Sequence, residues 1–484
     1  MSAPRFAVEA LDLFERRILL RMPFRFGVVT LTAAPQAYVR ARIRLADGRR
    51  SVGAAAEMMA PKWFDKNPAL SDEDNAQQLR ASLALAREAY LAGDENTAGG
   101  HWRDNYAPQI ARGAELGLNR LTACYGPALV DRALLDALCR ALGVSFYRAM
   151  RSNLPGIEAP GLDMPAFLSG LAPQATIAAR HTVGLSDPIT AGDLDRRVND
   201  GLPQTLEEVV ARYGQRYFKL KVDGDPRGAV ERLAAIAAVL DRIDAPYHAT
   251  LDGNEQYGDV DGALELWRRV AQEPRLARLA RSLLFVEQPV RRGNALARDI
   301  RPLAREIPVI IDESDDSLEA FPQARALGYA GVSSKTCKGL YKSFVNAARC
   351  AQWNREERTE RYFMSGEDLT VQAGIALQQD LALVSLLGIR HVERNGHHYV
   401  NGMAAAPESE QGAFLAAHPD LYERSHGAVR PALRDGMLAL GSLDCAGYAS
   451  GVLPDWESLP SMNVAAQTAA KSAISRLTSS GASS

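Results

Sequence analysis

Short apolar runs alternate with amphipathic helical segments between about residue 175 and residue 400. The segments between the runs, such as 228–240 and 340–353, place apolar residues at helical spacing. Eight strands that alternate with helices over roughly 220 residues predict a (β/α)8 barrel of the TIM type, an α/β fold. The expected strands are 175–183, 217–222, 248–252, 283–287, 308–312, 331–335, 361–365 and 389–393.

An open doubly wound sheet is the competing α/β architecture. Such a sheet usually carries a glycine-rich phosphate-binding turn after its first strand. Here the first strand is followed by H-T-V-G-L-S-D-P, and the chain has neither a G-x-G-x-x-G turn nor a P-loop. The pattern therefore favours the closed barrel.

The regions on either side of the barrel follow a different pattern. Residues 16–56 contain three extended runs, two of them joined by a turn at Asp47-Gly48, and residues 71–155 have helical periodicity. After residue 400 the alternation stops and short apolar pieces suggest a return to the first module. We expect an N-terminal α+β capping domain (1–170), a catalytic barrel (171–400) and a C-terminal segment (401–484) that completes the cap and ends in a loose Ala/Ser-rich tail.

Composition narrows the class of protein. The 484 residues are 47% hydrophobic and 24% charged with a formal net charge of -2, so no global field attracts nucleic acid or an anionic membrane. No apolar run approaches the ~20 residues that span a bilayer, and the start of the chain lacks the apolar core of a signal peptide. The five cysteines form no C-x-x-C pair, which predicts reduced thiols and a cytoplasmic protein. A possible homo-oligomer is compatible with these properties.

Lysines and acids stand where the predicted strands end. In a parallel barrel these positions face one common opening, where barrel active sites are built. Lys219 and Lys221 are two residues apart on one strand, so both side chains point to one face. The residues that share this placement are Lys219, Lys221, Asp252, Glu287, Asp312 and Lys335.

The acids and the lysines predict a metal flanked by bases. Asp252, Glu287 and Asp312 end three successive strands, and a few carboxylates with exchangeable positions are what Mg²⁺ prefers. Like-charge repulsion and a nearby metal lower the pKa of a lysine, which makes it a usable base. Taken one at a time, each acid could instead cap a helix, and each lysine could be a solvated or salt-bridged side chain.

The motif set resembles the enolase superfamily, in particular the muconate-lactonizing-enzyme-like branch that is grouped with mandelate racemase. The matching segments are Lys219-Leu220-Lys221, Asp252-Gly253-Asn254, Glu287-Gln288-Pro289, Asp312-Glu313-Ser314 and Lys335. The resemblance implies that Mg²⁺ holds a substrate carboxylate while a base removes the proton α to it, giving an enediolate. The outcome would be racemisation or epimerisation, cycloisomerisation, or elimination.

The resemblance also implies a role for each residue. Lys221 would be the base, Lys219 its electrostatic neighbour, and Lys335 the acid/base on the opposite face or the stabiliser of the enolate. The loops 24–27 and 57–60 would close over a small carboxylate substrate, whereas Trp63 could equally be ordinary packing between cap and barrel. The residues expected to bind substrate are Asn254, Glu367, Asp368 and Glu393.

The chain departs from the family at several points that concern the substrate. The sixth strand has no Asp partnered with a seventh-strand His, and the eighth strand ends in H-V-E-R-N without the D-x-D that binds an ammonium group in dipeptide epimerases. His397 and His398 follow this strand and could equally be surface residues.

Two other functions remain open on the sequence. One is a Schiff-base aldolase on the same barrel, with Lys221 or Lys335 as nucleophile, which borohydride trapping would reveal. The other is a non-catalytic barrel that binds a carboxylate ligand, which a proton-exchange assay in deuterated water would distinguish from an enzyme.

Overall fold

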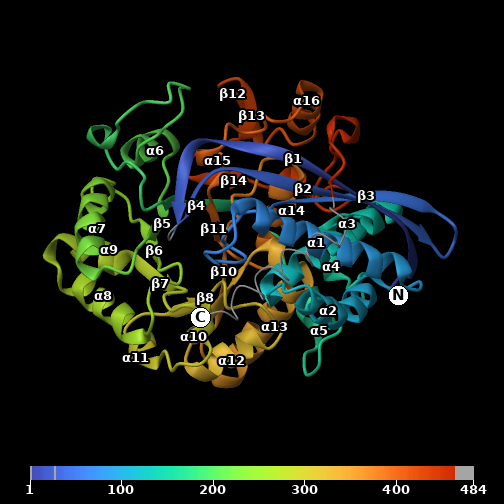
Figure 1. Ribbon diagram of the computed structural model, residues 1–484, viewed down its shortest axis with the longest axis horizontal. Coiled ribbons are helices and arrows are strands. Elements are labelled where there is room, and N and C mark those ends of the chain that lie inside the picture. The colour runs from blue at the N-terminus through green and yellow to red at the C-terminus, as the bar shows by residue number, and fades with distance from the viewer. Residues whose placement is uncertain (1–2, 27–28, 464–484) are drawn as a thin grey trace, which may run out of the picture.

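A closed ring of parallel strands forms the centre of the protein (Figure 1), for which a computed structural model describes residues 3–26 and 29–463. Parallel pairing runs in sequence order from β4 to β11, and pairing of β11 with β4 closes the ring. The predicted (β/α)8 barrel is therefore confirmed. The strands are β4 (Thr176–Val183), β5 (Tyr217–Lys221), β6 (His248–Asp252), β7 (Leu283–Glu287), β8 (Val309–Ile311), β9 (Gly331–Ser334), β10 (Phe363–Gly366) and β11 (His391–Arg394).

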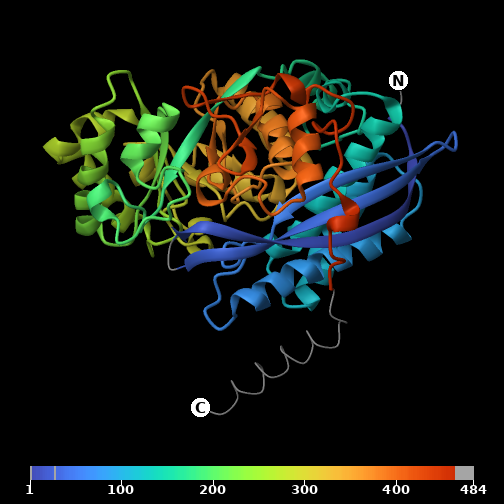
Figure 2. The same cartoon turned by 90° about the horizontal axis from the view of Figure 1, so that it is seen from above.

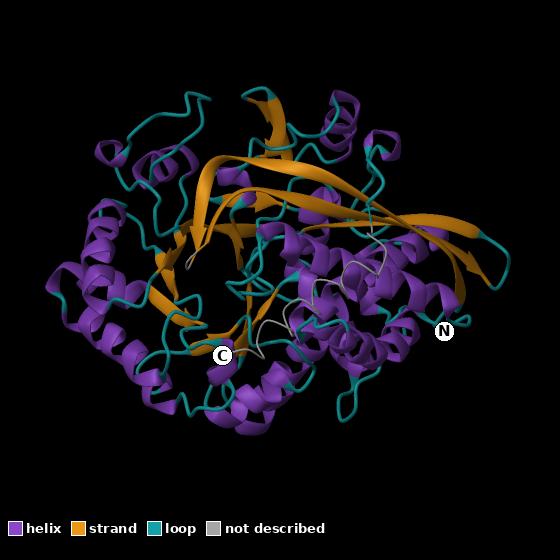
Figure 3. Cartoon of the chain, viewed as in Figure 1, coloured by secondary structure: helices purple, strands orange, loops and turns teal. Residues whose placement is uncertain are grey.

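Helices surround the ring on its outer side (Figure 3). Their apolar faces cover strands such as β8 and β9, in which every residue is buried. The helices between the barrel strands are α6 (Leu206–Tyr213), α7 (Pro226–Leu240), α8 (Val260–Gln272), α9 (Ala277–Ser282), α10 (Arg292–Ala295), α11 (Arg301–Ala304), α12 (Ala320–Leu327), α13 (Leu340–Glu357) and α14 (Ile375–Leu386).

The N-terminal region forms an antiparallel sheet packed against helices, as predicted. Its first strand begins at Phe6 instead of Arg16, because Phe6, Val8, Leu11 and Leu13 are buried and extend the amphipathic pattern towards the N-terminus. The elements of this cap are β1 (Phe6–Phe26), β2 (Val29–Leu45), β3 (Arg50–Met58), α1 (Asp72–Ala92), α2 (Ala98–Glu115), α3 (Arg120–Leu142), α4 (Phe146–Arg151) and α5 (Met164–Ser169).

The segment after the barrel contacts both other parts of the chain. β14 pairs antiparallel with β4 of the barrel. Further on, the N–H of Met462 donates to the carbonyl of Leu13 at 2.9 Å, so the chain returns to the edge of β1, as Figure 2 shows for the red segment beside the blue strands. The expected Ala/Ser-rich tail, the last twenty residues, lies outside the described residues. The elements of this segment are α15 (Gly396–Tyr399), α16 (Glu408–Ala417), β12 (Tyr422–Ser425), β13 (Ala428–Pro431) and β14 (Met437–Ala439).

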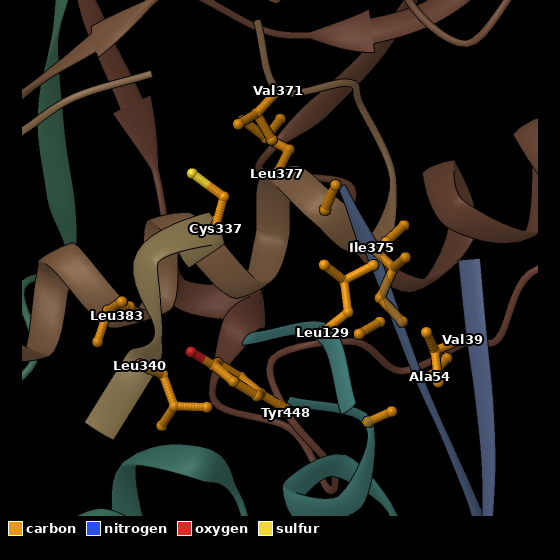
Figure 4. Close-up of a cluster of buried hydrophobic side chains, with 14 of the residues drawn as sticks. Val39, Ala54, Leu129, Cys337, Leu340, Val371, Ile375, Leu377, Leu383 and Tyr448 are labelled. Carbon is orange, nitrogen blue, oxygen red and sulfur yellow. The ribbon is translucent and has the colours of Figure 1, made fainter. Parts of the chain in front are cut away.

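A continuous apolar cluster joins the cap to the barrel (Figure 4). It brings together the cap strands, helix α3, the turn after β9 and helix α14. Because burial of this surface removes apolar area from water on both sides, it fixes the cap beside the barrel mouth. The labelled members are Val39, Ala54, Leu129, Cys337, Leu340, Val371, Ile375, Leu377, Leu383 and Tyr448.

The free cysteines and the helices agree with the expectations from the sequence. All five cysteines are free, and burial raises the pKa of the Cys337 thiol well above its usual value, as expected for a packed and unreactive side chain. Within the described ranges, no helix combines the length and apolar character needed to cross a membrane.

One buried acid in the cap predicts a pH-dependent stability. Asp131 on α3 is 2% exposed and accepts a 2.7 Å hydrogen bond from the Tyr90 hydroxyl, and burial raises its pKa to about 8. The unfolded chain releases this proton near pH 3.9, so its cost to folding is absent below that pH and grows as the pH rises towards 8.

We therefore expect Asp131→Asn to stabilise the protein by an amount that increases between pH 5 and pH 7, at up to about 1.4 kcal/mol per pH unit. Urea unfolding at the two pH values measures the change. The exposed Asp104→Asn serves as the control and should show no such trend. A gain that is the same at both pH values would mean that Asp131 ionises normally.

Candidate functional site

The Lys219 ammonium group lies among four carboxylates at the mouth of the barrel. Its Nζ is 2.9 Å from Asp252 Oδ2, 2.7 Å from Glu287 Oε2, 2.7 Å from Glu367 Oε2 and 2.9 Å from Glu393 Oε2. The side chain is 1% exposed. The barrel thus brings together acids from the third, fourth, seventh and eighth strands around a lysine from the second.

The four carboxylates around Lys219 shift its pKa in the direction opposite to the one expected from the sequence. Burial alone lowers it, but the negative charges of Asp252, Glu287, Glu367 and Glu393 raise it well above the usual value. The prediction of a lowered pKa from lysine–lysine repulsion is wrong for Lys219, because the carboxylates outweigh the neighbouring cations. The four carboxylates therefore favour the protonated, positively charged form of Lys219.

Lys221 and Asn254 both contact Asp252. Lys221 Nζ donates to Asp252 Oδ2 at 2.5 Å, and the backbone N–H of Asn254 donates to Oδ1 at 2.8 Å. Burial raises the pKa of Asp252, but Lys219 and Lys221 together hold it below its usual value. Asn254 has a φ of +41°, a left-handed conformation that asparagine tolerates, and its Oδ1 is buried without a hydrogen bond.

Glu287 has free acceptor capacity. Its side chain is 0% exposed, and the 2.7 Å contact with Lys219 lacks hydrogen-bond geometry, so neither carboxylate oxygen accepts a hydrogen bond. Burial, followed by the charges of Asp252 and Glu367, raises its pKa well above the usual value. A buried carboxylate without donors is costly unless another cation or proton joins it.

Asp312 is held by two lysines and a serine. Lys335 Nζ donates to Oδ2 at 2.5 Å, the Ser333 hydroxyl donates to Oδ1, and Lys338 Nζ lies 3.4 Å from Oδ1. Burial raises the pKa of Asp312, whereas the charges of Lys335 and Lys338 lower it far below its usual value. Lys338 was not recognised in the sequence, although K-T-C-K places it one helical turn after Lys335.

Gln288 ties two of the acid-bearing loops together. Its Oε1 accepts the backbone N–H groups of Asp312 (2.9 Å) and Ser314 (3.1 Å), and its Nε2 donates to the Ser314 hydroxyl at 2.8 Å. The side chain therefore fixes the loop after β8 relative to the end of β7. The E-Q-P segment contained this residue, but only the tertiary contact shows its role.

A small cavity of about 30 Å³ lies above these groups. Lys221 and Lys335 both line it, although they come from β5 and β9, which are four strands apart in the ring. The cap contributes aromatic and small side chains, so cap and barrel together enclose it. The lining residues are Phe24, Phe26, Ala60, Trp63, Lys221, Asn254, Lys335, Asp368, Leu369, Thr370, Glu393 and Asn395.

Glu367 does not line this cavity, unlike the other three residues expected to contact substrate. It is 0% exposed, and Arg180 on β4 donates to its Oε1 while Lys219 donates to its Oε2 at 2.7 Å. Arg180 is also 0% exposed and donates to the carbonyl of Gly366 at 2.9 Å. The pair lies inside the barrel and positions Lys219.

The cap loop that follows β3 is fastened over the mouth. Arg292 donates to the carbonyls of Trp63 and Phe64, each at 2.9 Å, and forms an ion pair with Glu255. The Trp63 ring lies over Lys335, with Nζ 4.2 Å from the ring centroid. Trp63 therefore contacts a predicted catalytic group and is more than packing between cap and barrel.

His397 and His398 are buried, so the alternative that they are surface residues is wrong. His398 packs edge-on against His181 on β4, with 4.8 Å between ring centroids, and also against Tyr399. Burial lowers the pKa of all three histidines, which holds them neutral. They support the loop after β11 and do not line the cavity.

The donor set suits a hard divalent cation. Asp252, Glu287 and Asp312 stand at the ends of adjacent strands, and both oxygens of Glu287 and the Oδ1 of Asn254 accept no hydrogen bond. Within the described part of the chain, no three Asp, Glu, His or Cys side chains already form a group that could hold a metal ion. Lysine ammonium groups contact all three carboxylates, so a bound cation would replace some of those contacts.

Comparisons with known proteins agree with the fold. Residues 202–439 match the family described as "Enolase C-terminal domain-like", which covers the barrel from α6 to β14. A search of curated proteins found no match.

Solved structures resemble nearly the whole chain. Muconate lactonizing enzyme from Pseudomonas fluorescens, complexed with muconolactone, is 18% identical with a TM-score of 0.58, covering 93% of this chain and 97% of that one. A putative mandelate racemase/muconate lactonizing enzyme from Sorangium cellulosum has the same identity and TM-score over 93% and 99%. An enolase from alpha pretobacterium bal199 with bound Mg is 16% identical with a TM-score of 0.57 over 93% and 98%.

Proposed function

Because the chain belongs to the enolase superfamily, we propose that it is a magnesium-dependent isomerase or lyase that removes the proton α to a carboxylate with lysine bases. The observation that carries the proposal is the placement of Lys221 and Lys335. They come from strands four apart in the ring, yet both line one cavity beside the three acids. Two amines on opposite sides of one cavity suit proton removal and return at a single carbon.

Asp252, Glu287 and Asp312 would hold the Mg²⁺. When bound, the ion supplies Lewis-acid stabilisation of the negative charge that develops on the substrate carboxylate. One structural relative, the enolase from alpha pretobacterium bal199, was solved with bound Mg. In this chain, Glu287 is the strongest support for the site, because its buried carboxylate accepts no hydrogen bond and has only an ion-pair contact with Lys219.

The side chains divide the proton chemistry between them. Lys221 would accept the α-proton, and Lys335 would act from the opposite side as acid/base or as stabiliser of the enediolate. Lys219, with its strongly raised pKa, would keep its proton and contribute a fixed positive charge. The apolar cap residues above the cavity would exclude water from the reacting carbon.

Exchange of the α-proton is the direct test. Small carboxylic acids incubated with the protein and Mg²⁺ in deuterated water should gain deuterium at the α-carbon, and a chelator should stop the exchange. Exchange that persists without a divalent ion, or borohydride trapping of a lysine adduct with a carbonyl substrate, would favour a Schiff-base mechanism instead.

The free cysteines also lead us to propose a cytoplasmic location.

Glu287→Gln should weaken Mg²⁺ binding with little change in shape. The substitution removes one negative ligand, so we expect a loss of at least the 10–100-fold that follows loss of a group supporting a ligand. Titration calorimetry measures it. The exposed Glu265→Gln is the matched control and should bind Mg²⁺ as before. Unchanged affinity in Glu287→Gln would remove Glu287 from the site.

A further inference from the structure

A second cavity, of about 510 Å³, lies at the end of the barrel opposite the candidate active site. Four of its lining residues are the first residues of barrel strands, and because the strands are parallel, those residues meet at the end of the ring away from the mouth. They are Tyr217 of β5, His248 of β6, Phe363 of β10 and His391 of β11. The volume lies within the range of about 300–1,000 Å³ that is typical of small-molecule pockets.

Most of the wall of the second cavity is apolar. It is built from α5 and the segment after it, from α13, from the second residues of β7 and β10, and from the turn before β11. A ligand in this cavity therefore removes apolar surface from water, which favours a ligand with an apolar body. Apolar members of the wall include Phe167, Leu171, Leu284, Met364, Leu387 and Ile389.

His391 offers the cavity a hydrogen-bond donor. The Arg180 guanidinium, which can only donate, lies 2.6 Å from His391 Nδ1, so Nδ1 is the acceptor of this bond. Burial, together with the charges of Arg180 and His248, lowers the pKa of His391 well below its usual value, which keeps the ring neutral. A neutral ring that accepts at Nδ1 carries its proton on Nε2. Within the described part of the chain, no group accepts a hydrogen bond from that Nε2.

Neighbouring rings hold His391 in place. Its ring stacks on Tyr217 with 4.7 Å between centroids and an angle of 20° between the ring planes. Tyr217 in turn contacts the His248 ring at 5.0 Å. Among the described residues, none forms a hydrogen bond with the Tyr217 hydroxyl, which is therefore a second polar group available to a ligand.

Arg390 supplies a cation at the edge of the second cavity. Its side chain is exposed and forms no hydrogen bond or ion pair with any described residue. Its backbone is fixed, because its carbonyl accepts the N–H of Ala178 at 3.1 Å and the preceding Ile389 carbonyl accepts a hydrogen bond from Gln174 at 2.8 Å. None of the described lining residues is an acid, so the lining holds nothing that neutralises this cation.

This combination distinguishes between classes of ligand. An ammonium ligand would find no acid in the described lining and would meet the Arg390 cation. A guanidinium group forms short, charge-assisted hydrogen bonds with a planar carboxylate, and the His391 N–H adds a neutral donor beside it. One cation and one or two polar groups next to a large apolar wall match an anion with a single small head and an apolar body.

We propose that the second cavity is a binding site for a small monocarboxylate with an apolar body. The carboxylate meets Arg390 and the Nε2–H of His391, and the body lies against the wall formed by α5 and α13. The site lies outside the candidate active site, so this proposal does not depend on the proposed function and its test needs no turnover.

The test compares octanoate with octylammonium, which have the same apolar chain and opposite charges. Titration calorimetry with the intact protein in the presence of a chelator measures binding without any contribution from a divalent ion. We expect octanoate to bind at least 10-fold more tightly than octylammonium. Undetectable binding of octanoate, or equal or tighter binding of octylammonium, would overturn the proposal.

Variants locate the binding at the second cavity. Arg390→Glu reverses the charge at its edge, and Ala351→Trp fills it from α13, so each should weaken octanoate binding at least 10-fold. Arg87→Glu, at an exposed position on α1, is the matched control and should bind octanoate as the wild type does. Circular dichroism checks folding, and Arg390→Glu, at an exposed position, decides the matter if Ala351→Trp does not fold. Wild-type affinity in Arg390→Glu would overturn the proposal.

Two further measurements exclude binding at the barrel mouth. Lys335→Ala changes the candidate active site and should leave octanoate affinity unchanged, whereas a loss as large as that of Arg390→Glu would place octanoate at the mouth and overturn the proposal. A crystal structure with 8-bromooctanoate should show an anomalous bromine peak between α5 and α13. A peak at the mouth alone would contradict the assignment.

Discussion

Lys221→Ala should abolish α-proton exchange from one enantiomer of a substrate and spare part of the exchange from the other. The two lysines come from strands four apart in the ring but line one cavity, so we expect each to reach a different face of the α-carbon. Loss of a positioned general base typically costs about 10²–10⁴-fold in rate. Exchange rates of the separated enantiomers in deuterated water, followed by mass spectrometry, measure the effect.

Lys335→Ala is the reciprocal variant and should show the opposite preference if both lysines act as bases. Equal impairment of both enantiomers by Lys335→Ala would identify Lys335 as a stabiliser of the enediolate, and the reaction as one-base elimination or cycloisomerisation. Unchanged exchange in both variants would refute the assignment of both lysines.

Arg180→Met should destabilise the protein by about 3–5 kcal/mol, because it removes one of the two cations that pair with the buried Glu367 carboxylate and leaves only Lys219. Arg180 and Glu367 are both 0% exposed, and the guanidinium also donates to the Gly366 carbonyl at 2.9 Å. Urea unfolding monitored by circular dichroism measures the loss, as a change in midpoint at constant slope.

A double-variant cycle separates the pair from simple packing. Glu367→Gln removes the negative charge, so Arg180→Met combined with Glu367→Gln should lose less stability than the sum of the two single changes. A purely additive result would show that Arg180 and Glu367 are not energetically coupled, and that the cost of Arg180→Met is lost side-chain packing.

The barrel and most of its mouth could be predicted from local pattern. Each strand is a short apolar run, and each run ends in the residue that faces the mouth, as Lys221, Asp252 and Glu287 do. The strand direction fixes which end of each run meets the opening, so the pattern predicts that residues far apart in sequence share one site.

In the cap, the local sequence pattern was not enough to locate the first strand. The sequence pattern places the start of the first strand at residue 16, whereas β1 begins at Phe6, because Glu9 and Asp12 interrupt the apolar residues of its first half. Its alternation becomes meaningful only beside β2, where Leu11 pairs with Ala41 and Leu13 pairs with Val39.

The sequence by itself determined the (β/α)8 barrel, the three acids and the three lysines at its mouth, because strand period and strand ends are local properties of the chain. Only the tertiary structure decided what those groups face. Arg180 and Glu367 are 187 positions apart yet form one buried pair, which sets the charge around Lys219. Trp63 contacts Lys335 from the cap. Protonation and cavity shape depend on such distant neighbours, since burial and Coulomb interactions act through space and leave no periodic mark in the sequence.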